Sequence, residues 1–356
     1  MMRLLHYIVI ILLLATPVQL SAASDAASFD ATKTIFDHLK DSYEWHITTI
    51  GDKHISIPRP VILYSEREGW AVFLSSVFHH TDTHRGFSIA RNGDAAGKIV
   101  EPVANGSYAR PLLDISITKN VLAIFLNSLM LVVLVLYLAR WYRRHGGTVV
   151  APRGFVGAME AIMVMIIDDV IKPNVGKQAA RFTPYLLIVF FYILLSNLMG
   201  LLPIFPGGAN VTGNIAVTLG LSLCTFVAVN VFGNKEYWKE ILWPDVPVWL
   251  KLPVPLMPFI ELIGIIVKPF ALTVRLFANI FAGHTALLVF VCLIFITMAV
   301  NKYLGSAMTV ISVMFTVFMN ILELLVAFIQ AFVFTMLSAV FIGLAQPDHH
   351  GANDKK

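Results

Sequence analysis

Long apolar segments separated by short polar ones fill the chain from about residue 120 to residue 345. The first, about Asn120–Ala139, has enough residues to cross the hydrocarbon core of a bilayer. The stretch Phe182–Asn234 contains no charged residue but is interrupted by prolines and glycines between positions 203 and 208. This interruption predicts a transmembrane hairpin of about Pro184–Leu202 and Asn210–Val231.

Two much longer apolar segments follow, about Phe259–Val300 and Tyr303–Ala345, separated by Asn301 and Lys302. At 1.5 Å per residue each would be a helix of roughly 60 Å, twice the thickness of the hydrocarbon core. We therefore expect two antiparallel helices, joined by a short turn, that tilt strongly or bend.

Two further segments are more polar. Gly154–Ile171 is apolar in its middle but closes with Asp168 and Asp169, so we expect an interfacial or re-entrant amphipathic helix rather than a full span. Lys235–Lys251 is charged and contains three tryptophans, which predicts a cytoplasmic loop at the level of the lipid headgroups.

The composition agrees with a membrane protein. Hydrophobic residues make up 57% of the chain and charged residues 13%, and the mean hydropathy is +0.76. A soluble globular protein is excluded by these values. The net charge of +4 includes no basic run interleaved with aromatic residues, so we expect no nucleic-acid partner. Cys224 and Cys292 lie in apolar runs without metal-ligand spacing, and we interpret both as lipid-facing or core-facing thiols.

The N-terminal third has a different character. Residues 1–23 combine a basic start, an apolar stretch and small residues before a cleavage site after Ala22 or Ala23, which predicts a signal peptide, with an uncleaved anchor as the alternative. Residues 24–117 have the composition of a water-facing domain. Within it we predict a helix over Phe29–His46 and strands at His54–Ile57 and Trp70–Leu74, a small α+β cap.

Basic residues set the topology. The first span ends in a cationic and aromatic flank, Arg140–His145, which marks the cytoplasmic side. The N-terminal domain is then periplasmic, the membrane domain of residues 118–346 crosses five times, and the tail of residues 347–356 is cytoplasmic. The histidines and aspartate of His79–His84 could bind a metal, but no second ligand pair has a recognised spacing, so a solvated loop is favoured.

Ionisable residues recur within the penultimate helix. Glu261, Lys268 and Arg275 are seven residues apart and form one stripe, and Asn279 lies on nearly the same face. His284 points to the opposite face, about 13 Å beyond Arg275 along the axis. A guanidinium inside a membrane helix costs at least about 2.5–3.5 kcal/mol, so it requires a partner charge or a water-filled path.

The final helix carries one carboxylate, Glu323, with Gln330 seven residues later on the same face. If Gln330 packs at the level of Arg275, Glu323 lies near His284, and the two share one outward-facing polar pocket. Such a pair suits proton entry, because both groups exchange protons with water. The structural alternative is that Arg275 only neutralises Glu323 or Glu261, but a fixed buried pair is weak evidence for stability.

Three strings resemble the signature of subunit a of F-type ATP synthases. They are Lys268–His284 (KPFALTVRLFANIFAGH), Ser196–Pro203 (SNLMGLLP) and the stretch that starts at Gln330 (QAFVF), and the resemblance covers about residues 114–345. It implies that Arg275 faces a rotating ring of c subunits, each with one membrane carboxylate.

The resemblance also implies two half-channels. Protons would enter from outside by way of His284 and Glu323, with Asn214 and Asn279 holding water, and would leave on the cytoplasmic side near Glu261. In many bacterial members the acid and the imidazole stand in the opposite order, so the pair His284 and Glu323 looks exchanged, as in the mitochondrial version. Gly200 stands where some bacterial members have an acid.

The predicted fold is an all-α polytopic membrane protein with about five transmembrane helices, an interfacial helix and a small extracytoplasmic domain. By resemblance it is a non-catalytic, proton-conducting stator subunit in the inner membrane of a bacterium. Its partners would be the c ring, b-type peripheral stalk subunits, the remainder of the synthase and membrane lipid. We expect no cofactor, and no GxxxxGK[ST] string occurs.

Two other functions fit parts of the pattern. A secondary transporter would bind its substrate midway through the membrane, but it predicts repeated halves with interrupted helices, and no such internal symmetry is visible. A structural scaffold for another complex is the third hypothesis.

Overall fold

The computed structural model falls into two compact units. The first comprises residues up to Leu122 with Gly200–Ala209 and Gly283–Leu322, and the second comprises Ala123–Met199, Asn210–Ala282 and the chain from Glu323 onward. The predicted signal peptide and C-terminal tail lie outside the described residues, as do His80 and Asp82 of the histidine-rich segment. The structure describes residues 31–32, 35, 41–50, 53–79, 81, 83–90, 95, 97–102, 108–145, 152–202, 207–242 and 256–346.

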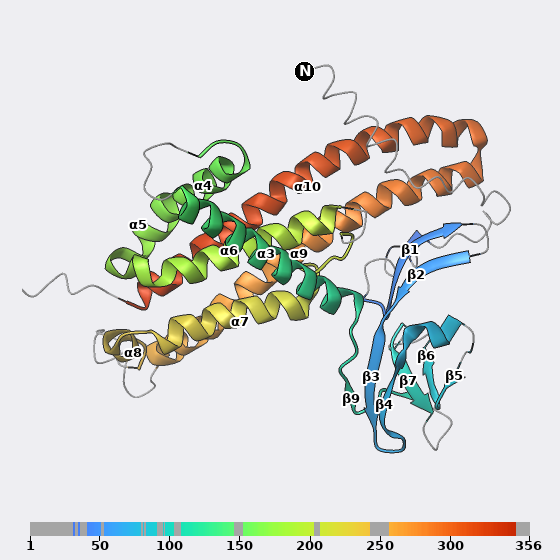
Figure 1. Ribbon diagram of the computed structural model, residues 1–356, viewed down its shortest axis with the longest axis horizontal. Helices are drawn as coiled ribbons and strands as arrows, with labels where there is room; N and C mark the ends of the chain where they lie inside the picture. Colours follow the sequence, from blue (N-terminus) through green and yellow to red (C-terminus); the bar gives the residue numbers. More distant parts are fainter. Residues whose placement is uncertain are drawn as a thin grey trace, which may run out of the picture. The chain divides into compact units, whose positions relative to one another are not determined.

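The N-terminal part of the first unit consists mainly of antiparallel strands (Figure 1). β1 pairs with β2, the order of the second sheet is β4-β3-β9, and that of the third is β5-β6-β7-β8. A short 3₁₀ helix follows β4 at Ser75–His79. The strand bounds are β1 Glu44–Ile50, β2 Lys53–Pro58, β3 Pro60–Ser65, β4 Gly69–Leu74, β5 Thr83–His84, β6 Phe87–Ile89, β7 Ile99–Pro102, β8 Tyr108–Ala109 and β9 Leu113–Asp114.

The two strands predicted in this domain are confirmed as parts of β2 and β4, but the predicted helix over Phe29–His46 is wrong at its end. Residues 44–46 belong to β1, which continues through isoleucines and threonines to Ile50. β-Branched residues favour strands, and here the pairing with β2 outweighs the helical periodicity of the preceding segment.

The strands lead directly into the first membrane helix, α3 (Lys119–Arg144). Residues 113–117 run beside β3, and two further backbone hydrogen bonds of 3.0 and 3.1 Å extend the pairing beyond β9. The Asp41 carboxylate accepts a hydrogen bond of 3.0 Å from the backbone N–H of Asn120, in the first turn of α3. A carboxylate at this position is favoured by the unpaired N–H groups and the dipole of the helix. The domain is therefore fixed to the start of α3.

α9 (Leu256–Val300) and α10 (Lys302–Leu344) are single long helices, as the sequence predicts. Their turn lies in the first unit at Asn301, whose carbonyl accepts from the N–H of Gly305 at 2.8 Å. Phe290 and Phe315 stack there with ring centroids 5.4 Å apart, which confirms the antiparallel arrangement in this unit.

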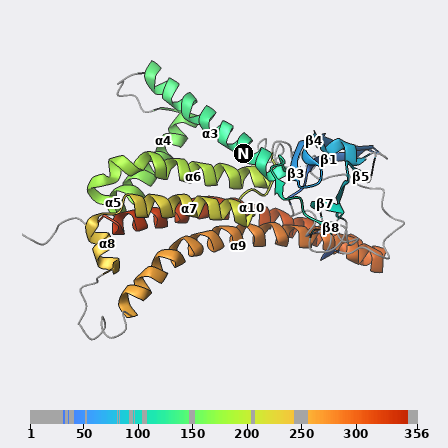
Figure 2. The same ribbon diagram turned by 90° about the horizontal axis from the view of Figure 1, so that it is seen from below.

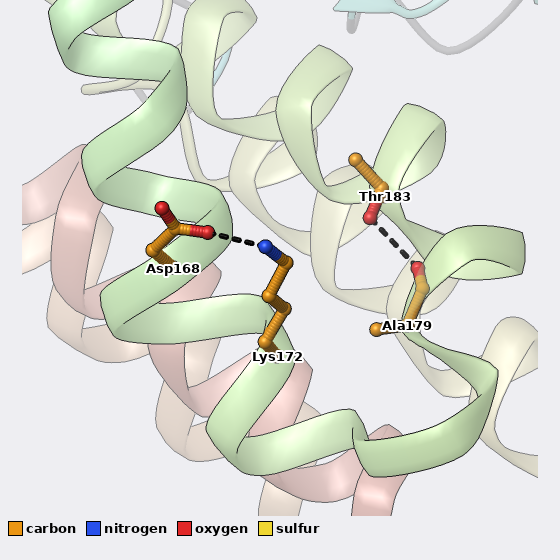
Figure 3. Close-up of polar contacts among 4 residues, drawn as sticks. All are labelled: Asp168, Lys172, Ala179 and Thr183. Atoms are coloured by element: carbon orange, nitrogen blue, oxygen red, sulfur yellow. Dashed lines mark hydrogen bonds and ion pairs between the residues drawn. The ribbon is translucent and has the colours of Figure 1, made fainter.

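The second unit begins, after most of α3, with a bent helical segment. α4 (Phe155–Met165) passes through a π-helical turn (Ile166–Ile171) into α5 (Lys172–Val175), and Lys172 forms an ion pair with Asp168 at 2.6 Å (Figure 3). Gly176, with a φ of 67°, reverses the chain before a short 3₁₀ turn at Gly176–Gln178. Its positive φ favours glycine. The interfacial position predicted for this segment stays a prediction.

α6 (Ala179–Leu201) and α7 (Ile215–Val231) follow, and then the short α8 (Lys235–Leu242). At the start of α6 the Thr183 hydroxyl donates to the carbonyl of Ala179 (2.7 Å; Figure 3). α6 and α7 lie side by side (Figures 1 and 2), and their buried side chains form one core with those of α4, α9 and α10 that belong to this unit.

Four described helical segments are long and apolar enough to cross a membrane: Lys119–Arg144, Phe155–Leu201, Phe259–Val300 and Tyr303–Leu344. α7 is apolar but has 17 residues, about 25 Å of helix, close to the thickness of the hydrocarbon core. The chain is therefore a multi-pass membrane protein. The count of five spans depends on α7 and on the chain reversal at Gly176.

Hydroxyl groups connect the helices of the second unit. Ser222 of α7 hydrogen bonds to Thr273 of α9 at 2.6 Å. Thr225, one turn further along α7, contacts Tyr185 of α6 at 3.0 Å and Ser338 of α10 at 3.3 Å. Small polar residues allow membrane helices to approach closely and to satisfy each other's hydrogen bonds. α7 therefore joins three neighbouring helices.

Candidate functional site

The polar stripe of α9 turns gradually from the helix interface to the surface. Glu261 and Lys268 are half-buried, whereas Arg275 and Asn279 are exposed. The Lys268 ammonium lies 5.6 Å from the centre of the Phe341 ring of α10. This contact places the first half of α9 antiparallel to the end of α10 within the second unit.

Arg275 is exposed on a strip of α9 that carries small side chains. Ala271 and Ala278, about one turn before and after it, are exposed as well. Among the described residues none forms an ion pair with Arg275, so neither Glu261 nor Glu323 neutralises it there. The exposed guanidinium is therefore accessible from outside this chain.

Glu323 and Gln330 of α10 are buried, in contrast to Arg275. The two residues are 5% and 7% exposed, and Ala327 between them is 1% exposed, so this face of α10 is buried. From Lys268 to Arg275 α9 advances seven residues. Because the helices are antiparallel, the corresponding residue of α10 lies seven positions before Phe341, at Phe334. Gln330, one turn from Phe334, is therefore expected near the level of Arg275.

Asn197 of α6 supplies polar contacts at this depth. Its amide donates to the carbonyl of Ala327 at 3.1 Å, and its side-chain oxygen accepts from the Thr212 hydroxyl at 2.6 Å. The neighbouring Ser196 accepts from Asn127 of α3 at 3.2 Å. Sequence reasoning gave Asn197 no role, although an amide in an uncharged apolar segment is a signal of a polar contact between helices.

His284 is half-buried in the first unit and lies beside Gly200. A Cβ atom added at Gly200 would come within 3.4 Å of His284 Nε2. The imidazole therefore occupies the space that a larger side chain at position 200 would enter. Glu323 belongs to the second unit, so its predicted pocket with His284 stays a prediction.

Asn214, predicted to hold water, is the N-cap of α7. Its side-chain oxygen accepts from the backbone N–H of Ala216 at 3.0 Å. Asparagine is among the favoured N-cap residues because it satisfies one of the unpaired N–H groups of the first turn. Its amide N–H groups and the second lone pair of its oxygen are left for contacts with water.

A small pocket lies in the second unit between α7, α8, α9 and α10. Asn230, Tyr237 and Lys268 line it together with Ser222 and Thr225. Its enclosed space has room for about one water molecule.

Tyr237 of α8 connects this pocket to Glu261. Burial raises the pKa of the Tyr237 phenol, and the negative charge of Glu261 raises it further. The phenol therefore stays protonated at neutral pH.

Comparisons with known proteins identify the family. Residues 124–343 match the family described as ATP synthase A chain, and residues 34–115 match a Domain of unknown function (DUF8433). The "ATP synthase subunit a" of Pelodictyon phaeoclathratiforme is 40% identical over 280 residues, which cover 77% of this chain and 76% of that protein.

Two further relatives agree. The "ATP synthase subunit a 2" of Chlorobaculum tepidum is 42% identical, covering 68% of this chain and 67% of its own length. The "ATP synthase subunit a" of Myxococcus xanthus is 41% identical, covering 67% and 76%. The family match includes α4, α6, α7, α9 and nearly all of α3 and α10, and therefore every candidate site residue. The chain belongs to the ATP synthase A chain family.

Proposed function

We propose that this chain is the proton-conducting stator subunit of a rotary ATP synthase and that Arg275 faces the ring of c subunits. The observation that carries this proposal is the position of Arg275, which is exposed on a strip of α9 lined by alanines. Small side chains allow a second helix to approach closely, and a cation in the membrane requires a partner. A carboxylate on a passing ring helix meets both conditions.

The guanidinium would act electrostatically. It cannot lose its proton, so it attracts each ionised carboxylate that passes and favours release of that carboxyl's proton. It also repels a free proton, which prevents direct leakage between the two sides of the membrane. Net flow then requires the ring to turn.

Proton entry would use His284 and Glu323, with Gln330 and Asn279 as polar groups between them and Arg275. His284 lies beside Gly200, where its imidazole occupies the space that an acidic side chain at position 200 would enter. This position supports the assignment of His284 to the entry path. Asn197 and Thr212 would position the buried face of α10 that carries Glu323 and Gln330. The amide N–H groups of Asn214 would provide a further contact for water.

Proton release would use the cytoplasmic end of α9. Glu261 is half-buried near the pocket lined by Asn230, Tyr237 and Lys268. A carboxylate beside a pocket with room for a water molecule can transfer its proton to that water. The basic flank of α3 supports a cytoplasmic position for this end of the second unit and a periplasmic position for the N-terminal domain.

The chain itself would be non-catalytic, and ATP chemistry would belong to other subunits of the complex, with b-type stalk subunits holding this one in place. Purification from the membrane in mild detergent tests the proposal. We expect the chain to co-isolate with a small two-helix proteolipid in a complex that pumps protons when ATP is added. Isolation as a monomer that transports a solute in proteoliposomes would contradict it.

A further inference from the structure

One face of the β4-β3-β9 sheet in the first unit is apolar and exposed. Trp70, Val72 and Leu74 alternate along β4 and are 59%, 62% and 51% exposed. Leu113 of β9 and Ile115 just after it are exposed too. We name these five residues the outer sheet face.

The register shows that these side chains share one side of the sheet. Tyr64 of β3 is paired with Trp70 on one side and with Leu113 on the other, and directly paired residues point to the same face. The rings of Tyr64 and Trp70 lie 5.2 Å apart. The outer sheet face is therefore continuous across the three strands and contains no charged side chain.

The other side of the same sheet is already the core of the domain. Val61, Leu63 and Ala71 are almost fully buried there, and Tyr43 donates a hydrogen bond to Asp114 over this side. An antiparallel sheet with one packed face normally presents polar residues on the other. Here both faces are apolar, so we expect an apolar partner rather than water to cover the outer sheet face.

The chain path determines which partner lies within reach. Residues 113–117 run beside β3 as a third strand, and α3 begins at Lys119. Lys119 is four residue steps after Ile115, so Ile115 lies within about 13 Å of the first residue of α3. That distance is on the order of the thickness of the lipid headgroup region together with the edge of the hydrocarbon core.

We propose that the outer sheet face lies on the membrane surface, with Trp70, Val72 and Ile115 inserted at the headgroup level around the start of α3. Tryptophan and tyrosine are enriched at this depth, where their apolar rings are buried and their polar atoms stay hydrated. The hydrogen bond between Asp41 and Asn120 connects the domain to the first turn of α3. The domain would thus lie flat on the outer leaflet as a lipid-binding platform.

Spin-label accessibility in the assembled enzyme tests this proposal. Cys224 and Cys292 are first replaced by alanine, and a nitroxide is attached to V72C in proteoliposomes of phosphatidylethanolamine and phosphatidylglycerol. T83C is the matched control, because Thr83 is an exposed strand residue of a different sheet. Collisions with O₂ report lipid, and collisions with a water-soluble nickel chelate report solvent.

We expect the label at position 72 to collide more often with O₂ and several times less often with the nickel chelate than the label at position 83. Equal nickel accessibility at the two positions would overturn the proposal, because the outer sheet face would then be in water. Low accessibility to both reagents at position 72 would overturn it as well, because another protein subunit would then cover the face. Coupled proton pumping of each labelled enzyme verifies that the domain and the complex are intact.

Discussion

The two ionisable residues at the middle of the membrane domain, Arg275 and Glu323, occupy opposite environments. Arg275 is exposed on α9 between alanines, whereas Glu323 is 5% exposed on α10 beside helices of its own chain. Both lie in the second unit. The difference agrees with our proposal that Arg275 acts on a group outside this chain and that Glu323 acts within it.

This contrast explains why a membrane protein keeps both charges. A buried carboxyl surrounded by its own helices has a fixed environment and is suited to pass protons along one path. A cation on the surface of a helix has no fixed partner and is suited to meet a series of passing carboxylates. We expect substitutions on the two helices to fail in different ways.

Arg275→Ala should have the largest effect. Without the guanidinium no group attracts the ring carboxylates or blocks direct leakage, so ATP-driven proton pumping should fall to background while the chain still inserts and assembles. Pumping in inverted membrane vesicles is the measurement. The control is Arg181→Ala, since Arg181 contacts only aromatic rings at the start of α6 and should retain coupling. Normal pumping by the Arg275 variant would contradict an external partner.

Changes at His284 and Glu323 should come next. If both groups belong to one entry path, His284→Ala with Glu323→Ala should remove most of the proton flux, and the exchange of the two residues should retain more. Passive proton flux through the membrane sector, measured after the catalytic part is stripped, separates the two variants. Equal loss in both would argue against a shared path.

Ala278→Trp should produce an intermediate defect on the α9 surface. Ala278 is exposed one turn from Arg275, so a large ring there should not disturb the fold of this chain but should prevent a ring helix from approaching. We expect lower recovery of the proteolipid on purification. Ala307→Trp, at an exposed position of α10 in the first unit, is the control and should leave recovery unchanged. Full recovery of the proteolipid with the Ala278→Trp variant would place the ring elsewhere.

Asn197→Ala should have the smallest effect and should act through stability. It removes the hydrogen bonds to Ala327 and Thr212 and leaves buried polar groups unsatisfied, which costs about 1–3 kcal/mol. Thermal unfolding in detergent should shift to lower temperature by several degrees. Asn174→Ala is the comparison, since the described hydrogen bond of that amide, of 2.7 Å, is to the carbonyl of Val170 four residues earlier. An equal shift of the unfolding temperature in the two variants would show that the contacts of Asn197 between helices add no stability of their own.

The sequence predicted the helices of the membrane domain well because their apolar length and their interruptions decide them. The bounds of α9 and α10 differ by at most a few residues from those predicted. The periodicity of the stripe from Glu261 to Arg275 was also readable, because a single continuous helix carries it.

Features set by tertiary contacts were not readable from one sequence. The end of the helix predicted over Phe29–His46 was wrong, because residues 44–46 pair with β2 and form a strand. The gradual turn of the α9 stripe from buried to exposed depends on which helices pack against it. Asn197 was missed because its partners, Thr212 and Ala327, are 15 and 130 residues away.

The position of Arg275 against the ring can be tested directly by disulfide cross-linking. A cysteine at Ala278, beside Arg275, is paired in turn with single cysteines along the carboxylate-bearing helix of the c subunit, in an enzyme without other cysteines. A disulfide requires Cα atoms within about 7 Å, so we expect a cross-linked product that is strongest within one turn of the ring carboxylate. Formation of the product should stop ATP-driven rotation until a reductant is added. Absence of cross-links from Ala278, with efficient cross-links from the opposite face of α9 instead, would contradict the account.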